Sequence, residues 1–236
     1  MKKTILYSLF LILAFPLLVA CNDDEDQLSD SRVTYYPVLT VQGDEFVIVP
    51  IGSSYTDEGC TATLQGEDYS SHVEASGISD INTNQAGLYY VTYTAVNADG
   101  YSVSASRTVA VCDPSITTDL SGSYTLQEGS YRLSKGVKTA YSGYNVKVSK
   151  AAPGIFKVSD FLGGYYDQRV GYGSNYAMTG YIQLLADNTV KILSGDVPGW
   201  GDSYTDFQEG KYDPATKTIS YVVTYAGMEF HVSMKI

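Results

Sequence analysis

An alternation of side chains over residues 87–111 most constrains what this chain can fold into. One face of the first run would carry mostly apolar side chains, from Tyr89, Val91, Tyr93 and Ala95. A turn containing Asp99-Gly100 follows, and the same inward pattern then resumes from Tyr101 through Val111. Two such runs joined by a turn with Asp-Gly predict an antiparallel β-hairpin.

The composition extends this prediction to the whole chain. Of its 236 residues, 22 are Tyr and 22 are Gly. Tyr favours strands, as Val and Thr do, and Gly favours turns. Beyond residue 20, no window of eleven or more residues shows a convincing helical period. The sequence therefore predicts an all-β protein.

Two domains are expected. Shorter strand candidates precede the hairpin. Residues 33–113 would therefore hold roughly six or seven strands, as an immunoglobulin-like β-sandwich does. Pro114 opens a linker over 114–119, because proline cannot donate a ladder hydrogen bond. Residues 120–236 would form roughly eight further strands joined by hairpins. Such a meander predicts a barrel-like antiparallel β-domain, closed or nearly closed.

The first residues predict export. Lys2 and Lys3 precede an apolar run over 5–19, which is shorter than the ~20 residues of a membrane span. Residues 1–20 resemble a bacterial lipoprotein signal peptide, which implies lipidation of Cys21. An uncleaved anchor helix is the alternative. Residues 21–32 would be an acidic tether, and its resemblance to a surface-export signal favours an outer-membrane anchor with the protein exposed at the cell surface.

Charge and cysteines limit the partners further. The net charge of −11 argues against nucleic acid, which requires Lys/Arg patches. Cys60 shares parity with inward residues and Cys112 does not, so two unpaired thiols are expected in preference to a disulfide. No spacing of Cys and His suggests a metal, and nothing in the sequence suggests a cofactor.

Three separated motifs carry a resemblance to a known family. Residues 52–62 contain G-S-x-Y-x-D-x-G-x-x-A, residues 86–95 contain x-G-x-Y-x-V-x-Y-x-A, and residues 107–111 contain R-x-V-x-V. In this order they resemble bacterial immunoglobulin-like modules, although Cys60 stands where that family usually has a small apolar residue. The resemblance implies the sandwich fold, in proteins that mostly serve as spacers or binding platforms.

The second domain carries a more general resemblance. The opening Gly122-Ser123-Tyr124 and the closing hairpins are similar to the C-terminal β-domain of surface lipoproteins with an N-terminal immunoglobulin-like module. Such proteins accompany the starch-utilisation type of outer-membrane glycan-uptake apparatus. The resemblance implies a polysaccharide or oligosaccharide ligand and an outer-membrane uptake complex as a further partner.

Catalytic residues are not expected. His231 falls on a polar strand face, His72 begins a strand, and no G-x-S-x-G elbow is present. Asp57 and its neighbour Glu58 would be surface charge in a loop, as would the pair Glu67 and Asp68. The sequence therefore predicts a protein that is not an enzyme.

Two segments rich in glycine and aromatic residues, 163–176 and 197–204, are the best candidates for a binding site. Aromatic rings can stack on the apolar face of a pyranose while polar neighbours bind its hydroxyls. The glycan-binding candidates are Trp200, Tyr204, Tyr165, Tyr166 and Asp202. Alternatively, Trp200 plugs one end of the barrel and the tyrosines cover strands.

A non-catalytic glycan-binding lipoprotein of the cell surface is the leading hypothesis. The alternative is a structural or protein-interaction lipoprotein that docks on an outer-membrane complex, because Tyr and Trp are enriched at protein interfaces. A barrel enclosing a small apolar ligand and a hydrolase are less favoured hypotheses.

Overall fold

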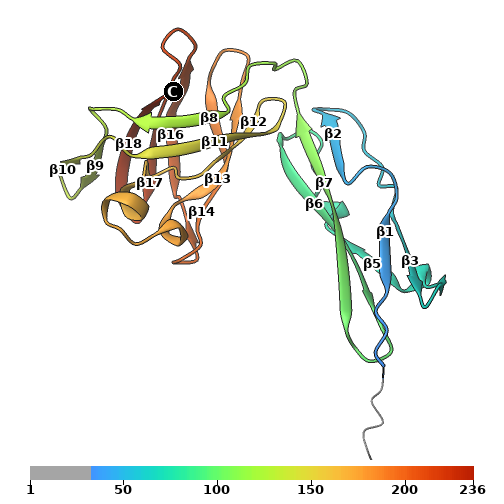
Figure 1. The fold of residues 1–236 in the computed structure, drawn as a ribbon. Coiled ribbons are helices and arrows are strands. Elements are labelled where there is room, and N and C mark those ends of the chain that lie inside the picture. The colour runs from blue at the N-terminus through green and yellow to red at the C-terminus, as the bar shows by residue number, and fades with distance from the viewer. Residues whose placement is uncertain (1–32) are drawn as a thin grey trace, which may run out of the picture. The chain divides into compact units, whose positions relative to one another are not determined.

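The computed structural model describes residues 33–236 (Figure 1). Residues 1–35 form one part of the chain and Tyr36–Ile236 another, and only the second is described below. The expected signal peptide, Cys21 and the tether to residue 32 lie outside the described residues. Within the described range, no helix has the length and apolar character needed to cross a bilayer.

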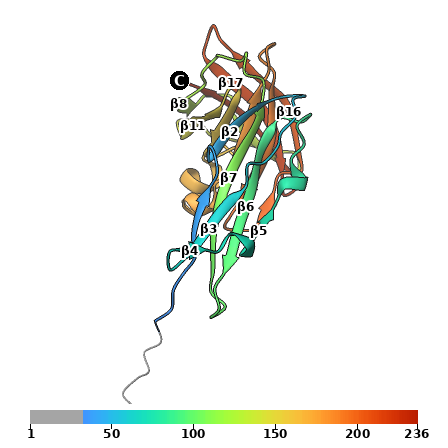
Figure 2. The ribbon, with the colours of Figure 1, turned by 90° about the vertical axis from the view of Figure 1, so that its right-hand side faces the viewer.

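The residues before 113 form two small sheets (Figure 2). One has the order β1-β3-β4 and the other the order β2-β7-β6-β5, with β2 parallel to β7. The strands are β1 (Val38–Val41), β2 (Phe46–Pro50), β3 (Cys60–Leu64), β4 (Glu67–Asp68), β5 (Val73–Ser76), β6 (Gly87–Val96) and β7 (Ser102–Cys112). The short helical turns η3 (Ser70–His72) and η4 (Ile78–Asp80) connect them.

The predicted hairpin is confirmed as β6 and β7, which pair in register from Val96 opposite Ser102. Val91, Tyr93 and Ala95 are buried, as the alternation requires. Tyr101 was expected to face inward, but 53% of its side chain is exposed because it precedes β7 in the turn.

The two cysteines in the described residues are both free. Cys60 is partly buried, in agreement with its inward parity. Cys112 was expected to face outward, but it is buried. Residues 109–112 are all buried, so both faces of β7 are covered at its end, and alternation there no longer separates inside from outside.

A buried ion pair lies at the centre of the N-terminal domain and corrects the prediction that Asp57 is surface charge. The side chains of Arg107 and Asp57 are 1% and 6% exposed, and Nη1 lies 2.5 Å from Oδ1. Tyr93 and Tyr55 donate hydroxyl hydrogen bonds to Asp57, and Gly59 donates its backbone N–H. The family motifs therefore supply the two charges and the donors that satisfy them.

The electrostatic state of Asp57 follows from these contacts. Burial opposes its ionisation, but hydrogen bonds from Tyr93, Tyr55 and Gly59 and the charge of Arg107 outweigh that effect and lower its pKa. Arg107 also donates Nε–H to the Asp44 carbonyl and an Nη2–H to the Gln42 carbonyl. The guanidinium thus links strand β7 to the chain between β1 and β2.

The residues after 120 form one large antiparallel sheet (Figure 1). The strands are β8 (Gly122–Leu126), β9 (Tyr131–Ser134), β10 (Val137–Ala140), β11 (Asn145–Ala152), β12 (Ile155–Val158), β13 (Thr179–Leu184), β14 (Val190–Val197), β15 (Asp202–Ser203), β16 (Asp206–Asp213), β17 (Thr218–Tyr225) and β18 (Met228–Lys235). Its order is β10-β9-β18-β8-β11-β12-β13-β14-β15, and β16-β17 continues from β18.

The antiparallel prediction is confirmed, but a closed barrel is not found. Between the β14 edge and β16, the described residues form one isolated bridge, between Thr189 just before β14 and Lys211, and no continuous ladder. Inward side chains such as Phe156, Phe161 and Phe230 are fully buried and fill the interior of the curved sheet. A side-chain-filled interior gives no support to the hypothesis of an enclosed apolar ligand.

Replacing Arg107 with Met should destabilise the N-terminal domain by about 3–5 kcal/mol, because Asp57 would remain buried without its partner charge. Hydrogen exchange of the β6 and β7 amides measures this. The control is Glu58→Gln, which changes the exposed carboxylate that follows Asp57 in the sequence. It should leave hydrogen exchange nearly unchanged.

The same pair predicts a dependence on pH. Because the folded pKa of Asp57 lies below its unfolded value of about 3.9, its contribution to stability is complete above that value. The contribution is lost as the pH falls through the lower folded pKa. Protection of the β6 amides should therefore fall on acidification below about pH 4. If Asp57→Asn has the same amide protection as the wild type at neutral pH, this account is wrong.

Candidate functional site

One buried carboxylate fixes the segment that carries most of the site. Asp160 is buried, and its Oδ1 accepts the backbone N–H groups of Leu162 at 2.8 Å and Met178 at 3.1 Å. Its Oδ2 accepts the N–H of Gly164 at 2.9 Å. Because Leu162 and Met178 lie near the two ends of the segment, Asp160 closes it into a fixed loop.

Two further features hold the loop against the sheet. The Gln168 side chain accepts the N–H of Asn145 and donates to its carbonyl, at 3.1 and 2.7 Å. Gly164 has a φ of 81°, and a Cβ there would lie 2.8 Å from the Cβ of Tyr144. The loop thus needs glycine at its start and forms the short helical turns η5 (Tyr165–Arg169) and η6 (Ser174–Tyr176).

A second turn presents Trp200 beside this loop. The N–H groups of Trp200 and Gly201 both bond to the Val197 carbonyl, and the N–H of Gly199 bonds to the Asn175 carbonyl at 2.6 Å. A Cβ at Gly199 would lie 2.8 Å from the Tyr176 ring. The glycine before Trp200 is therefore explained by the close approach of the turn to η6.

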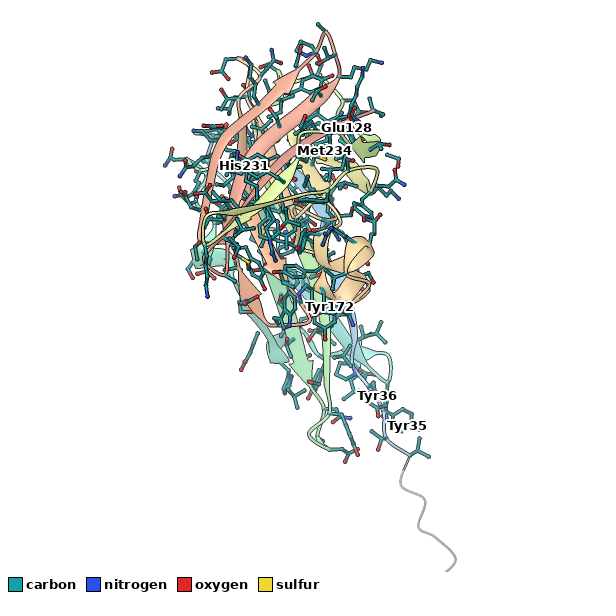
Figure 3. All side chains as sticks on the ribbon, turned by 90° about the vertical axis from the view of Figure 1, so that its left-hand side faces the viewer. Tyr35, Tyr36, Glu128, Tyr172, His231 and Met234 are labelled. Carbon is teal, nitrogen blue, oxygen red and sulfur yellow. The ribbon has the colours of Figure 1, made fainter. Side chains whose placement is uncertain are left out.

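The two segments bring four aromatic side chains together, which we call the aromatic platform: Tyr166, Tyr172, Tyr176 and Trp200. The Trp200 ring centroid lies 4.9 Å from that of Tyr166, 4.8 Å from Tyr176 and 6.2 Å from Tyr172, all in edge-on or steeply tilted geometry. Trp200 is 43% exposed and Tyr172 is 55% exposed. Figure 3 shows Tyr172 beside the helical turns. The platform is thus an open aromatic surface.

Buried Tyr225, together with exposed Asp202, supports the platform. The Tyr225 ring stacks on Trp200 at 6.1 Å with an interplanar angle of 25°. Its hydroxyl donates to Asp202 Oδ1 at 2.7 Å. Burial and the Asp202 carboxylate raise the pKa of Tyr225 well above its ordinary value, so it stays protonated as a donor. One face of the indole is therefore backed, while much of Trp200 stays accessible.

The predicted site residues divide into two groups. Trp200 and Tyr166 lie in the platform, and Asp202 supports it through Tyr225. Tyr165 is buried in the core, with the guanidinium groups of Arg132 and Arg169 within 5.0 Å of its ring centroid. Tyr204 is half-buried and packs against the core near Gly195. Tyr165 therefore leaves almost no surface for a ligand, whereas Tyr204 keeps part of its side chain accessible.

Three further residues belong to the site and were not among the named candidates: Tyr172 and Tyr176, which lie in the segment 163–176 singled out above, and Tyr225. Gly171-Tyr172-Gly173 was a usable signal, since a tyrosine between glycines has no strand neighbours to cover. Tyr225 gave no such signal, because its alternation in β17 is that of an ordinary core residue.

The two histidines lie in ordinary surface surroundings. His231 stacks on Tyr131 at 4.1 Å and its Nε2 lies 3.0 Å from Glu229 Oε2. His72 stacks on Tyr69 at 3.8 Å, and its Nδ1 lies 3.3 Å from the hydroxyl of the adjacent Ser71. His231 is partly buried between β18 and β9, and His72 is exposed.

Comparisons with known proteins place the chain. A family model described as a bacterial surface protein Ig-like domain matches residues 39–111, and a C-terminal domain model matches residues 113–235. The lipoprotein BT2262 from Bacteroides thetaiotaomicron is 40% identical over 85% of this chain and 100% of its own, with a TM-score of 0.49. The chain therefore belongs to the same family as this lipoprotein. It is a homologue of a Bacteroides lipoprotein and contains a bacterial surface domain.

Two more distant structures are also similar. The CBM51-2 (in complex with GlcNAc) and INT domains of Clostridium perfringens ZmpB are 18% identical, over 52% of this chain and 28% of that chain, with a TM-score of 0.27. A Bacteroides ovatus protein of unknown function is 13% identical, over 89% of this chain and 83% of its own, with a TM-score of 0.30. At these scores neither bears on function. No curated protein matches the sequence.

The loop anchor predicts a dependence on pH. Burial raises the pKa of Asp160 to about 7, although the N–H groups of Leu162, Met178 and Gly164 favour its ionised form. An unfolded Asp titrates near ~3.9, so the contribution of Asp160 to stability is complete below that pH and is lost as the pH rises through 7. Hydrogen exchange of the loop amides compares the wild type with Asp160→Asn. The extra protection of the wild type should decrease as the pH rises through 7. A constant difference would contradict the raised pKa.

Proposed function

We propose that this protein is a non-catalytic glycan-binding lipoprotein of the cell surface, and that the aromatic platform is its binding site. The observation that carries the proposal is the accessible Trp200, backed by Tyr225 and surrounded by three tyrosines. Membership of a Bacteroides lipoprotein family supports the location.

The shape and chemistry of the platform suit a sugar ring. A pyranose has an apolar face of C–H groups that packs on an aromatic ring and a rim of hydroxyls that form hydrogen bonds. The tyrosine hydroxyls around Trp200 can supply such bonds at the rim. Aromatic side chains also lose little conformational entropy on binding, and here packing already holds them.

The platform supports binding more than hydrolysis. Glycoside hydrolysis commonly requires two carboxyl groups flanking the scissile bond, at separations of about 5–10 Å. Asp202 is the carboxylate at the platform, and its Oδ1 accepts the Tyr225 hydroxyl. We therefore propose that the protein releases no product, which an assay of reducing ends on purified protein would test.

The N-terminal residues complete the proposal. Cleavage before Cys21 and its acylation would anchor the chain to the outer membrane, with the immunoglobulin-like domain as spacer between the lipid and the platform. A partner in an outer-membrane uptake complex fits the same arrangement, since captured glycan would need a transporter.

The Trp200→Ala change should weaken polysaccharide retention in affinity electrophoresis by roughly thirtyfold, or about 2 kcal/mol, because it removes the largest accessible ring of the platform. Trp200→Phe should retain part of the affinity. Because Trp200 is 43% exposed, the domain should stay folded, which circular dichroism would verify.

Tyr101→Ala is the matched control for this experiment. Tyr101 is another exposed aromatic residue, and its ring contacts Tyr36 in the N-terminal domain, far along the chain from the platform. Its loss should leave retention unchanged. If Trp200→Ala also left retention unchanged and a protein partner were recovered instead, the protein-interaction alternative would be favoured.

Lipidation has a separate test. Labelling cells with a palmitate analogue should mark the wild-type protein, and Cys21→Ser should abolish the label and release the protein from the membrane fraction. Cys60→Ser is the control, because that thiol lies in β3 within the folded domain. A label that persists in Cys21→Ser would refute the assignment of the anchor.

A further inference from the structure

A surface groove of about 480 Å³, lined mostly by residues with polar side chains, borders the loop that carries the platform. Its floor is the outer face of β11, β12 and β13, and its wall is formed by η5 and η6. The lining residues include Lys147, Ser149, Lys157, Asp167, Gln168 and Ser174.

The floor of the groove places two lysines side by side. Lys147 pairs with Ser159 across β11 and β12, and Lys157 is two residues before Ser159 on the same face. Diagonal neighbours of this kind lie about 7–8 Å apart. Both side chains are exposed, and within residues 33–236 neither lysine forms an ion pair with a carboxylate.

The charge of the groove differs from that of the chain. Two lysines outnumber the single carboxylate of Asp167 in its lining, whereas the chain carries a net charge of −11. Like charges on neighbouring positions of a sheet face repel each other. An anion bound between Lys147 and Lys157 would relieve that repulsion, and the hydroxyls of Ser149 and Ser174 could donate to it.

The groove and the platform share one wall. Tyr166 belongs to the platform and the next residue, Asp167, lines the groove. In the same way, Tyr172 belongs to the platform and Ser174 lines the groove. The wall is held by the Asp160 and Gln168 hydrogen bonds, so the two surfaces are fixed relative to each other. A glycan chain bound on the platform would therefore lie against the same loop that lines the groove.

We propose that the groove binds the carboxylate or sulfate groups of an acidic glycan whose sugar ring stacks on the aromatic platform. This inference rests on the proposed function and names the substrate class of the same site. Lysine ammonium groups recognise both kinds of anion as point charges, so the groove selects for negative charge on the polymer.

Polymers that differ only in charge test the proposal. The protein used is residues 21–236, and its retention is measured in gels that contain polymer relative to gels without polymer. One pair of polymers is polygalacturonate and its methyl ester, and the other is dextran sulfate and dextran. The wild type should be retained more strongly by the acidic member of at least one pair, and salt between about 0.05 and 0.5 M should weaken that preference. The pair that shows the preference identifies carboxylate or sulfate as the anion.

A charge-matched pair of variants locates the effect. Lys147→Gln with Lys157→Gln should reduce binding to the acidic polymer about tenfold. Lys191→Gln with Lys211→Gln changes the net charge equally, at exposed lysines on β14 and β16, and should leave the preference intact. Equal loss in both variants, or none in the first, would overturn the proposal.

The outcomes separate this inference from the function on which it rests. If neutral polymers are retained through Trp200 and no acidic polymer is preferred, glycan binding stands and the acidic substrate class is wrong. If neither member of any pair is retained and a wider glycan array is also silent, the proposed function fails and this inference fails with it.

Discussion

The buried carboxylate of Asp160 is the constraint on which the candidate site depends. It accepts N–H groups from both ends of the segment between β12 and β13, so that the whole segment 159–178 is held against the sheet. Without that closure Tyr166, Tyr172 and Tyr176 would lie on a free loop. Immobilising such a side chain on binding costs about 0.5–1.5 kcal/mol of conformational free energy. Here the side chains are already held in the folded protein, so ligand binding need not order them.

The N-terminal domain solves a related problem with a charge pair. Arg107 and Asp57 join strand β7 to the loop before β3, and every oxygen of Asp57 receives a donor. A buried pair of this kind adds little net stability over apolar packing, but it penalises any register that separates the two charges.

Two kinds of surface meet at the loop of the C-terminal domain. The aromatic platform offers area without charge, and the groove adds the positive charges of Lys147 and Lys157. A neutral sugar would use the first alone, whereas an acidic glycan would use both. The charge of the groove gains significance from the acidity of the chain, because a positive patch on such a protein opposes its overall field.

The sequence by itself determined the all-β class, the hairpin of β6 and β7 and the antiparallel C-terminal sheet, because side-chain alternation is a local property of a strand. It also singled out Trp200 and Tyr166, through the glycines around them. Only the tertiary structure decided that Tyr165 is core, that Tyr225 backs Trp200, that Asp57 is buried against Arg107, and that Lys147 and Lys157 adjoin. Each of these depends on which distant segments meet. Period and composition carry no information about such meetings, since strand register and loop closure are set by the packing of the whole domain.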